Sequence, residues 1–279
     1  MRHKNVGIVI GIVFVAGACT PGATEMPPGT PPAPSPSGAP SAQAATSAPS
    51  TIPPTPVAFQ RNPAPFVEGA TYAQAIDPAA FVDGIDNPFF PMIRGAVFEF
   101  DGAEHVEVEV LPDRKVILGV EVTVVRDRVY EDGKLIEDTL DWYAQDRQGN
   151  VWYFGEETAE YEDGKVTSTA GSWEAGVDGA LPGIVMLAEP RPGDEYRQEF
   201  YEGEAEDVAA IVATEGTIAV DAGSWDGTDV LVTEEWTPLE PDVRERKTYA
   251  RGFGVVEIRT IEGGDDVTTL TSAIYPIVD

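Results

Sequence analysis

Positions 105–110 of the chain read HVEVEV, and this short stretch decides the class of fold. Its three valines fall on one face of an extended chain, while His105, Glu107 and Glu109 fall on the other, because successive side chains of a strand point to opposite sides. The stretch VEVTV at 120–124 repeats the alternation. The pattern predicts strands of an antiparallel sheet that is buried on one face and exposed to solvent on the other.

Turn signals separate the extended segments at short intervals. Asp-Gly pairs stand at 132–133 and 163–164, each between two extended runs. This dipeptide tolerates the positive φ angles of a two-residue hairpin turn, so each pair predicts a hairpin. Further turns are expected at 148–150 and 263–265, where Gly, Asn and Asp gather.

Helical periodicity is nearly absent from the chain. The best candidates are Tyr72 to Phe81, which Pro78 interrupts, and the short segment Glu204 to Ile211. With many strands, short hairpins and no alternating helices, the sequence predicts an all-β fold, mainly antiparallel. We expect a large curved meander sheet that forms a half-barrel or open barrel, with one or two short helices.

The charge balance excludes some classes of partner. The chain has 48 Asp and Glu against 18 Lys and Arg, for a formal net charge of −30, and residues 66–279 alone hold 47 acidic and 15 basic residues. Such a field repels phosphate backbones, so nucleic acid is excluded, while a basic protein partner is allowed. One cysteine and two histidines leave no intramolecular disulfide and no zinc finger.

Residues 1–18 have the pattern of a secretion signal, with a basic start followed by an uncharged, mostly aliphatic run. That run is shorter than the ~20 apolar residues of a membrane-spanning helix. The segment Ala16-Gly17-Ala18-Cys19 resembles the lipobox of bacterial lipoproteins, in which the cysteine is acylated and becomes the first residue of the mature chain. The resemblance implies a lipid anchor at Cys19, which places the protein outside the cytoplasm on the surface of a membrane. The sequence does not specify which membrane this is. The alternative is that Cys19 only ends an ordinary signal peptide.

Residues 19–65 differ in composition from the rest of the chain. Of the 24 prolines, 14 fall between positions 20 and 65, among Ala, Ser, Thr and Gly. Such a segment buries too little apolar surface to fold and favours extended geometry. The sequence therefore predicts a lipidated cysteine and disordered tether over 19–65, and an antiparallel β domain over 66–279.

Several segments of the β domain carry a resemblance to known proteins. WYAQD at 142–146, GNVWYFGE at 149–156, GSWEAG at 171–176 and YARGFGVV at 249–256 resemble a group of uncharacterised bacterial secreted proteins and lipoproteins. The last segment is also similar to half-barrel envelope proteins of the outer-membrane lipoprotein-carrier type. The resemblance implies a curved sheet in the cell envelope and binding of an apolar ligand, and it supplies no catalytic residues.

Catalytic constellations are scarce. Once the leader is removed His105 is the only histidine, and no Gly-x-Ser-x-Gly motif occurs. Asp138, Asp141, Glu156 and Glu157 surround the tryptophan-rich hairpin, as the acid pair of a glycoside hydrolase would. Because a chain this acidic produces such neighbours by chance, we name no catalytic residue and favour a non-enzymatic role.

Two turns, at 83–87 and 146–150, are rich in side-chain oxygens that could hold a Ca²⁺ ion. Neither matches the twelve-residue calcium loop, and Asp and Asn in turns ordinarily bond to their own backbone. We assign no metal site and no cofactor.

Aromatic residues give the better candidate for a binding site. Adjacent aromatics at 142–143 and 152–154 point to opposite faces of two predicted strands, so that one set fills the core and the other either packs the sheet or lines a groove. The apolar loop 171–189 is either a lid over that groove or a plug at the open edge of the sheet. The candidate ligand-binding residues are Trp142, Tyr143, Trp152, Tyr153, Trp173 and Met186.

Three functions remain open on the sequence. The favoured one is a cell-envelope lipoprotein with an extracytoplasmic β domain that binds an apolar or amphipathic ligand, such as a lipid or small apolar molecule. The alternatives are a carboxylate-dependent hydrolase of envelope glycans and a structural or interaction lipoprotein.

Overall fold

The computed structural model describes residues 60–276, and nearly all of their regular structure is antiparallel β. Sixteen strands form one barrel-like sheet, and two more form a separate hairpin sheet. This confirms the predicted fold class. The predicted leader, Cys19 and positions 20–59 lie outside the described residues. Within 60–276 no helix is long and apolar enough to cross a bilayer.

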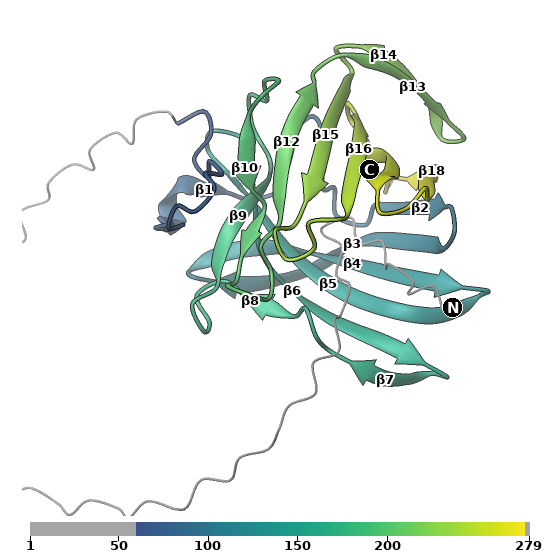
Figure 1. The fold of residues 1–279 in the computed structure, drawn as a ribbon, viewed down its shortest axis with the longest axis horizontal. Helices are drawn as coiled ribbons and strands as arrows, with labels where there is room; N and C mark the ends of the chain where they lie inside the picture. Colours follow the sequence, from purple (N-terminus) through teal and green to yellow (C-terminus); the bar gives the residue numbers. More distant parts are fainter. Residues whose placement is uncertain (1–59, 277–279) are drawn as a thin grey trace, which may run out of the picture. The chain divides into compact units, whose positions relative to one another are not determined.

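The elements follow one another in the order of their labels in Figure 1. The first group is the 3₁₀ helix η1 (Pro78–Ala80) and strands β1 (Phe81–Val82), β2 (Val97–Asp101), β3 (His105–Ile117), β4 (Val120–Glu131), β5 (Lys134–Asp146), β6 (Val151–Glu162), β7 (Lys165–Ser168), β8 (Trp173–Glu174) and β9 (Leu181–Met186). The second group is β10 (Glu195–Arg197), β11 (Glu199–Phe200), β12 (Val208–Ala213), β13 (Gly216–Val220), β14 (Gly223–Gly227), β15 (Val230–Trp236), β16 (Arg244–Ala250), β17 (Gly254–Glu262) and β18 (Val267–Ile274).

The main sheet is built mostly from neighbours in sequence. Strands β2 to β6 form one meander, β15 to β18 form another, and β18 pairs with β2 to join the two. The full path runs β10-β12-β15-β16-β17-β18-β2-β3-β4-β5-β6-β9-β11. In Figure 1 strands β3 to β6 lie side by side as one curved layer, with β12, β15 and β16 rising from it.

The two ends of this path are close in sequence. One end is β10 and the other is β11, and the single residue Gln198 lies between them. The chain therefore crosses from one edge of the sheet to the other within six residues, 195–200. The curved sheet is nearly closed, since its two edges meet at this segment rather than facing solvent.

The strand at 105–110 has the faces that the alternation predicted. Val106, Val108 and Val110 are buried, while His105 and the glutamates between the valines are partly exposed. Both Asp-Gly pairs form hairpin turns with positive φ angles at each residue, as at Asp132 (50°) and Gly133 (73°). These local predictions are confirmed because one buried face and one tight turn suffice to set them.

The helical candidates fare less well. The 3₁₀ helix Pro78–Ala80 is the one helical element within the described part of the chain, capped by the Asp77 side chain, which accepts a hydrogen bond of 3.0 Å from the Ala79 amide. The helix expected over Glu204 to Ile211 is wrong. Val208–Ala213 is instead strand β12, paired with β10 and β15, because sheet pairing outweighs the weak local preference of this segment.

Ordered contacts begin a few residues before Phe66. Ala64 is fully buried, and its carbonyl accepts a hydrogen bond from the Arg197 amide. Pro65 forms a bridge to Tyr196, and Arg61 pairs with Asp194. These residues lie against β10, which they cover on its free side.

The apolar loop at 171–189 contains strand β9, which pairs with β6 on one side and β11 on the other. Five of the six residues in β9 are buried. Of the two roles left open for this loop, the structure shows the one that fills the edge of the sheet.

Gly183 lies where β9 meets residues 195–200, which we call the closing segment, and a Cβ atom built there would come within 2.3 Å of the Gln198 carbonyl carbon. We predict that Gly183→Ala destabilises the protein by about 3 kcal/mol, because the obstacle is backbone and cannot swing aside. Calorimetric unfolding measures this. In the control Gly264→Ala the nearest atom is a Thr260 methyl at 3.2 Å, which leaves stability nearly unchanged. Equal stability of the two variants would contradict the closing contact.

Candidate functional site

The six aromatic and apolar residues predicted to bind a ligand all lie in the core. The exposed fractions of their surface are Trp142 4%, Tyr143 1%, Trp152 6%, Tyr153 0%, Trp173 5% and Met186 0%. Both faces of the aromatic hairpin are covered. Contact of these residues with a ligand stays a prediction, and it would require the sheet to open.

The covered aromatics divide between the two faces. On one face Tyr143 and Tyr153 stack with ring centroids 4.8 Å apart, and Trp173 packs edge-on against Tyr153 at 5.4 Å. On the other face the ammonium of Lys115 lies 3.2 Å from the centre of the Trp142 ring. Trp152 donates a hydrogen bond of 2.9 Å to Asp146 there.

Two carboxyl groups meet at the buried end of the aromatic stack. The Tyr153 hydroxyl lies 2.6 Å from Oδ1 of Asp141 and 3.1 Å from Oε2 of Glu156, residues that oppose each other across β5 and β6. A hydroxyl has one proton to donate, so the second contact is a good hydrogen bond only if a carboxyl group donates it. Burial raises the pKa of Asp141 to about 7. Burial and the nearby charges of Asp141 and Glu137 hold the pKa of Glu156 well above its usual range.

A third buried acid lies near Glu156, in the closing segment 195–200. Glu199 on β11 is fully buried, and the Trp173 indole and the Asp207 backbone are the hydrogen-bonding groups that act on its carboxyl group. Burial and the nearby charges of Asp207 and Glu156 hold the pKa of Glu199 well above its usual range. These two hydrogen bonds do not offset the burial of a charge next to other acids, so protonation is the favoured state of this group.

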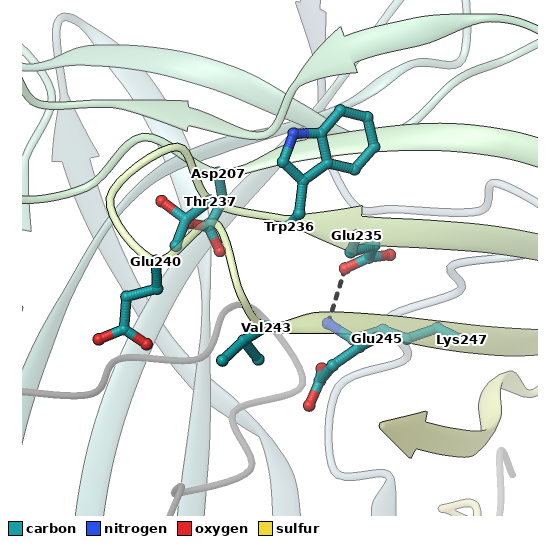
Figure 2. A pocket seen from close by; sticks show the side chains of 8 residues that line it. All are labelled: Asp207, Glu235, Trp236, Thr237, Glu240, Val243, Glu245 and Lys247. Atoms are coloured by element: carbon teal, nitrogen blue, oxygen red, sulfur yellow. Dashed lines mark ion pairs between the residues drawn. The ribbon is translucent and has the colours of Figure 1, made fainter. Parts of the chain in front are cut away.

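One buried lysine supplies a positive charge next to these acids. Lys247 is 2% exposed, and its ammonium forms an ion pair of 2.8 Å with Glu235. Figure 2 marks this pair with a dashed line. The same glutamate accepts hydrogen bonds from Thr233 at 2.7 Å and Tyr249 at 3.1 Å. Beside this pair lies a hollow of about 20 Å³, lined by Asp207 and Glu245 among others, which is room for about one water molecule.

The interior contains several ionisable side chains, but a ligand in solvent has little access to them. Asp141 and Glu156, the acids proposed for glycan hydrolysis, are 1% and 2% exposed and share one tyrosine hydroxyl. The two other candidates lie apart from them: Asp138 forms an ion pair with Arg126 at 2.6 Å, and Glu157 is exposed. A sugar ring does not reach the buried pair in this conformation.

A larger, open concavity lies elsewhere, and we call it the Asp83 groove. It is about 800 Å³ in volume and is lined by residues of 82–86, 92–94 and 145–149 together with Arg114 and Pro276. It brings together the two oxygen-rich turns noted in the sequence. Its apolar surface includes Val82 and Ile93, which are 36% and 45% exposed.

The oxygens of the two turns are used within the protein. In the first turn, Asp86 accepts a hydrogen bond of 2.6 Å from the Gln145 side chain, and Asn87 accepts one of 2.9 Å from the Phe89 amide. Asp146 accepts from the amides of Gln148 and Asn150 at 2.9 and 3.0 Å. In the described part of the chain no group of three or more His, Cys, Asp or Glu side chains is placed to hold a metal ion.

The sequence reasoning missed Arg94 and Arg114 as groove residues. They come from separate segments, and no local motif joins them to the turn at 145–149. The available signal was the scarcity of basic residues, of which residues 66–279 have 15.

Two solved structures are similar to part of this chain. An exported-protein candidate with a YmcC-like fold from Bacteroides fragilis aligns with a TM-score of 0.40 and 15% identity, over 67% of this chain and 98% of its own. A lipoprotein candidate from Parabacteroides distasonis aligns with a TM-score of 0.39 and 11% identity, over 67% of this chain and 99% of its own. No family model and no curated protein matches the chain.

The stability of the protein is predicted to fall as the pH rises. Burial raises the pKa of Asp141 and Glu137 to about 7, so the folded chain keeps protons that the unfolded chain releases above pH ~4.5. The stabilising contribution is complete below that pH and is lost as the pH rises through about 7. We expect a Tm about 5 °C lower near pH 8.5 than near pH 5.5, measured in about 0.5 M NaCl to screen surface repulsion.

Two variants localise this effect. Glu199→Gln removes a charge that burial disfavours and keeps the shape of the side chain, so it should reduce the difference in Tm between the two pH values. Glu162→Gln, at an exposed strand end, should leave that difference unchanged. A Tm that rises with pH would contradict the protonated interior.

Proposed function

We propose that this protein is an extracytoplasmic lipoprotein, anchored through Cys19, whose β domain binds an apolar or amphipathic ligand without catalysis. The leader and the lipobox-like segment support the anchor, although both lie outside the described residues. The resemblance of the β domain to secreted proteins and lipoproteins supports the location.

The observation that carries the ligand-binding part is the Asp83 groove. Its volume of about 800 Å³ falls within the ~300 to 1,000 Å³ of ordinary ligand pockets. By contrast, the hollow beside Lys247 and an apolar hollow lined by Phe90, Phe98 and Phe100 are each about 20 Å³. A second open concavity of about 410 Å³ is lined by several acidic residues, among them Asp101, Glu104 and Glu107. The Asp83 groove is the larger of the two and combines apolar with basic side chains.

The composition of the groove favours an amphipathic ligand. Val82 precedes Asp83 and Ile93 precedes Arg94, so exposed apolar surface lies directly beside charged side chains. A ligand with a short apolar chain and a polar head group matches this arrangement, because each part finds a surface of its own kind.

We predict that Ile93→Asp abolishes binding of a dansyl-labelled undecanoic acid probe, measured by the rise of dansyl fluorescence. Ile93 is exposed, so the change removes apolar contact for the probe with little effect on folding. Val166→Asp, at a somewhat more exposed position on β7 (54% against 45%), is the matched control and should bind as the unchanged protein does. Saturable binding that survives Ile93→Asp, or no binding at all, would overturn the assignment of the groove.

The anchor has a separate test. Metabolic labelling with an alkyne-bearing fatty acid should mark the full-length protein, and Cys19→Ser should abolish the label, because the chain has one cysteine. Subcellular fractionation should then move the protein from the membrane pellet to the soluble fraction. Equal labelling of the two forms would refute the lipid anchor and leave the groove untouched.

A further inference from the structure

Arginines meet in the Asp83 groove of a protein in which basic residues are rare. Arg94, Arg114 and Arg147 all line it, although residues 66–279 carry 47 acidic and only 15 basic residues. We propose that Arg94 and Arg114 bind the anionic head group of the amphipathic ligand, an inference that rests on the function proposed above.

The two guanidinium groups share one carboxylate. Nη2 of Arg94 lies 2.9 Å from Oδ1 of Asp83, and Nη2 of Arg114 lies 3.7 Å from the same oxygen. The side chain of Asp83 is 75% exposed, so it can turn into solvent without disturbing the core. An incoming oxyanion would take its place between the two arginines.

Arg114 has few partners for a side chain so deeply set. Its side chain is 16% exposed, and its nearest carboxylate oxygens are 3.6 Å away on Glu121 and 3.7 Å away on Asp83. One long contact of 3.4 Å to the Asp113 carbonyl completes its polar neighbours within hydrogen-bond reach. Since a guanidinium carries five N–H donors in a planar fork, most of the donors on Arg114 remain free to receive a carboxylate or phosphate.

The electrostatics of the arginine pair agree with this role. Burial and the neighbouring charge of Arg94 lower the pKa of Arg114. An anion between the two groups would relieve their mutual repulsion, whereas a cation would add to it. The pair is therefore selective for the sign of the charge on the ligand.

The other acids of the groove are held by neutral donors. Asp86 accepts a hydrogen bond of 2.6 Å from the Gln145 side chain. Asp146 accepts from backbone amides of its own turn and from Trp152. Asp83 is thus the acid that an anionic head group would displace, while the apolar chain would lie along Val82 and Ile93.

Isothermal titration of the full-length protein, carrying Cys19→Ser to keep it soluble, tests the proposal with four twelve-carbon probes below their micelle concentrations. These are dodecanoate, dodecyl phosphate, dodecanol and dodecyltrimethylammonium. The two anions should bind at least about tenfold more tightly than the alcohol or the cation. Acetate and inorganic phosphate serve as arms that separate head-group binding from binding of a free anion, and both should bind more weakly than the amphiphiles.

Variants assign the effect to the arginines. The double variant Arg94→Gln, Arg114→Gln should bind dodecanoate about tenfold more weakly, or weaker still, and should bind dodecanol with unchanged affinity. Asp83→Asn should strengthen the binding of dodecanoate, because it removes the competing carboxylate. Asp83 is exposed, so this substitution should not impair folding. Arg251→Gln, in an exposed ion pair with Asp229, is the matched control. Equal affinity for all four probes, or no effect of the arginine and Asp83 variants, would overturn the head-group assignment alone. If no amphiphile binds, the proposed function fails with it.

Discussion

The six residues 195–200 hold the two edges of the main sheet together. They carry the chain from β10 to β11, the two ends of the sheet path, with Gln198 alone between them. The crossing is close enough that Gly183 on β9 has no room for a side chain. Because the edges meet here, a wide meander becomes a nearly closed sheet with an interior, and Glu199 is carried into that interior.

Closure explains why the interior and the groove differ in character. Side chains that would face water in an open half-barrel are enclosed, so Asp141, Glu156 and Glu199 lie in a dry space with Lys247 as a nearby cation. Buried acids without enough partners keep their protons, and a buried ion pair such as Lys247 with Glu235 adds little net stability. The filled interior leaves the open space outside the sheet, in the Asp83 groove.

The sequence predicts the local structure well and the long-range structure poorly. The alternation at 105–110 and the two Asp-Gly turns set strand faces and hairpins by themselves, and both are confirmed. Closure is different, since it depends on pairs far apart in the chain, and β12 forms a strand only because β10 and β15 flank it. The same limit applies to the sites. Glutamates on a strand are taken to face water until closure encloses them, and arginines from separate segments meet only in the folded chain.

The protonated interior is the most direct consequence of closure, and nuclear magnetic resonance measures it without reference to any ligand. In protein labelled with ¹³C at the side-chain carboxyl groups of glutamate, we expect resonances that remain in the protonated position near pH 7, one of which disappears in Glu199→Gln. If every glutamate instead titrates near its ordinary pKa of ~4.5, the acids are in contact with water and the sheet is not closed as described.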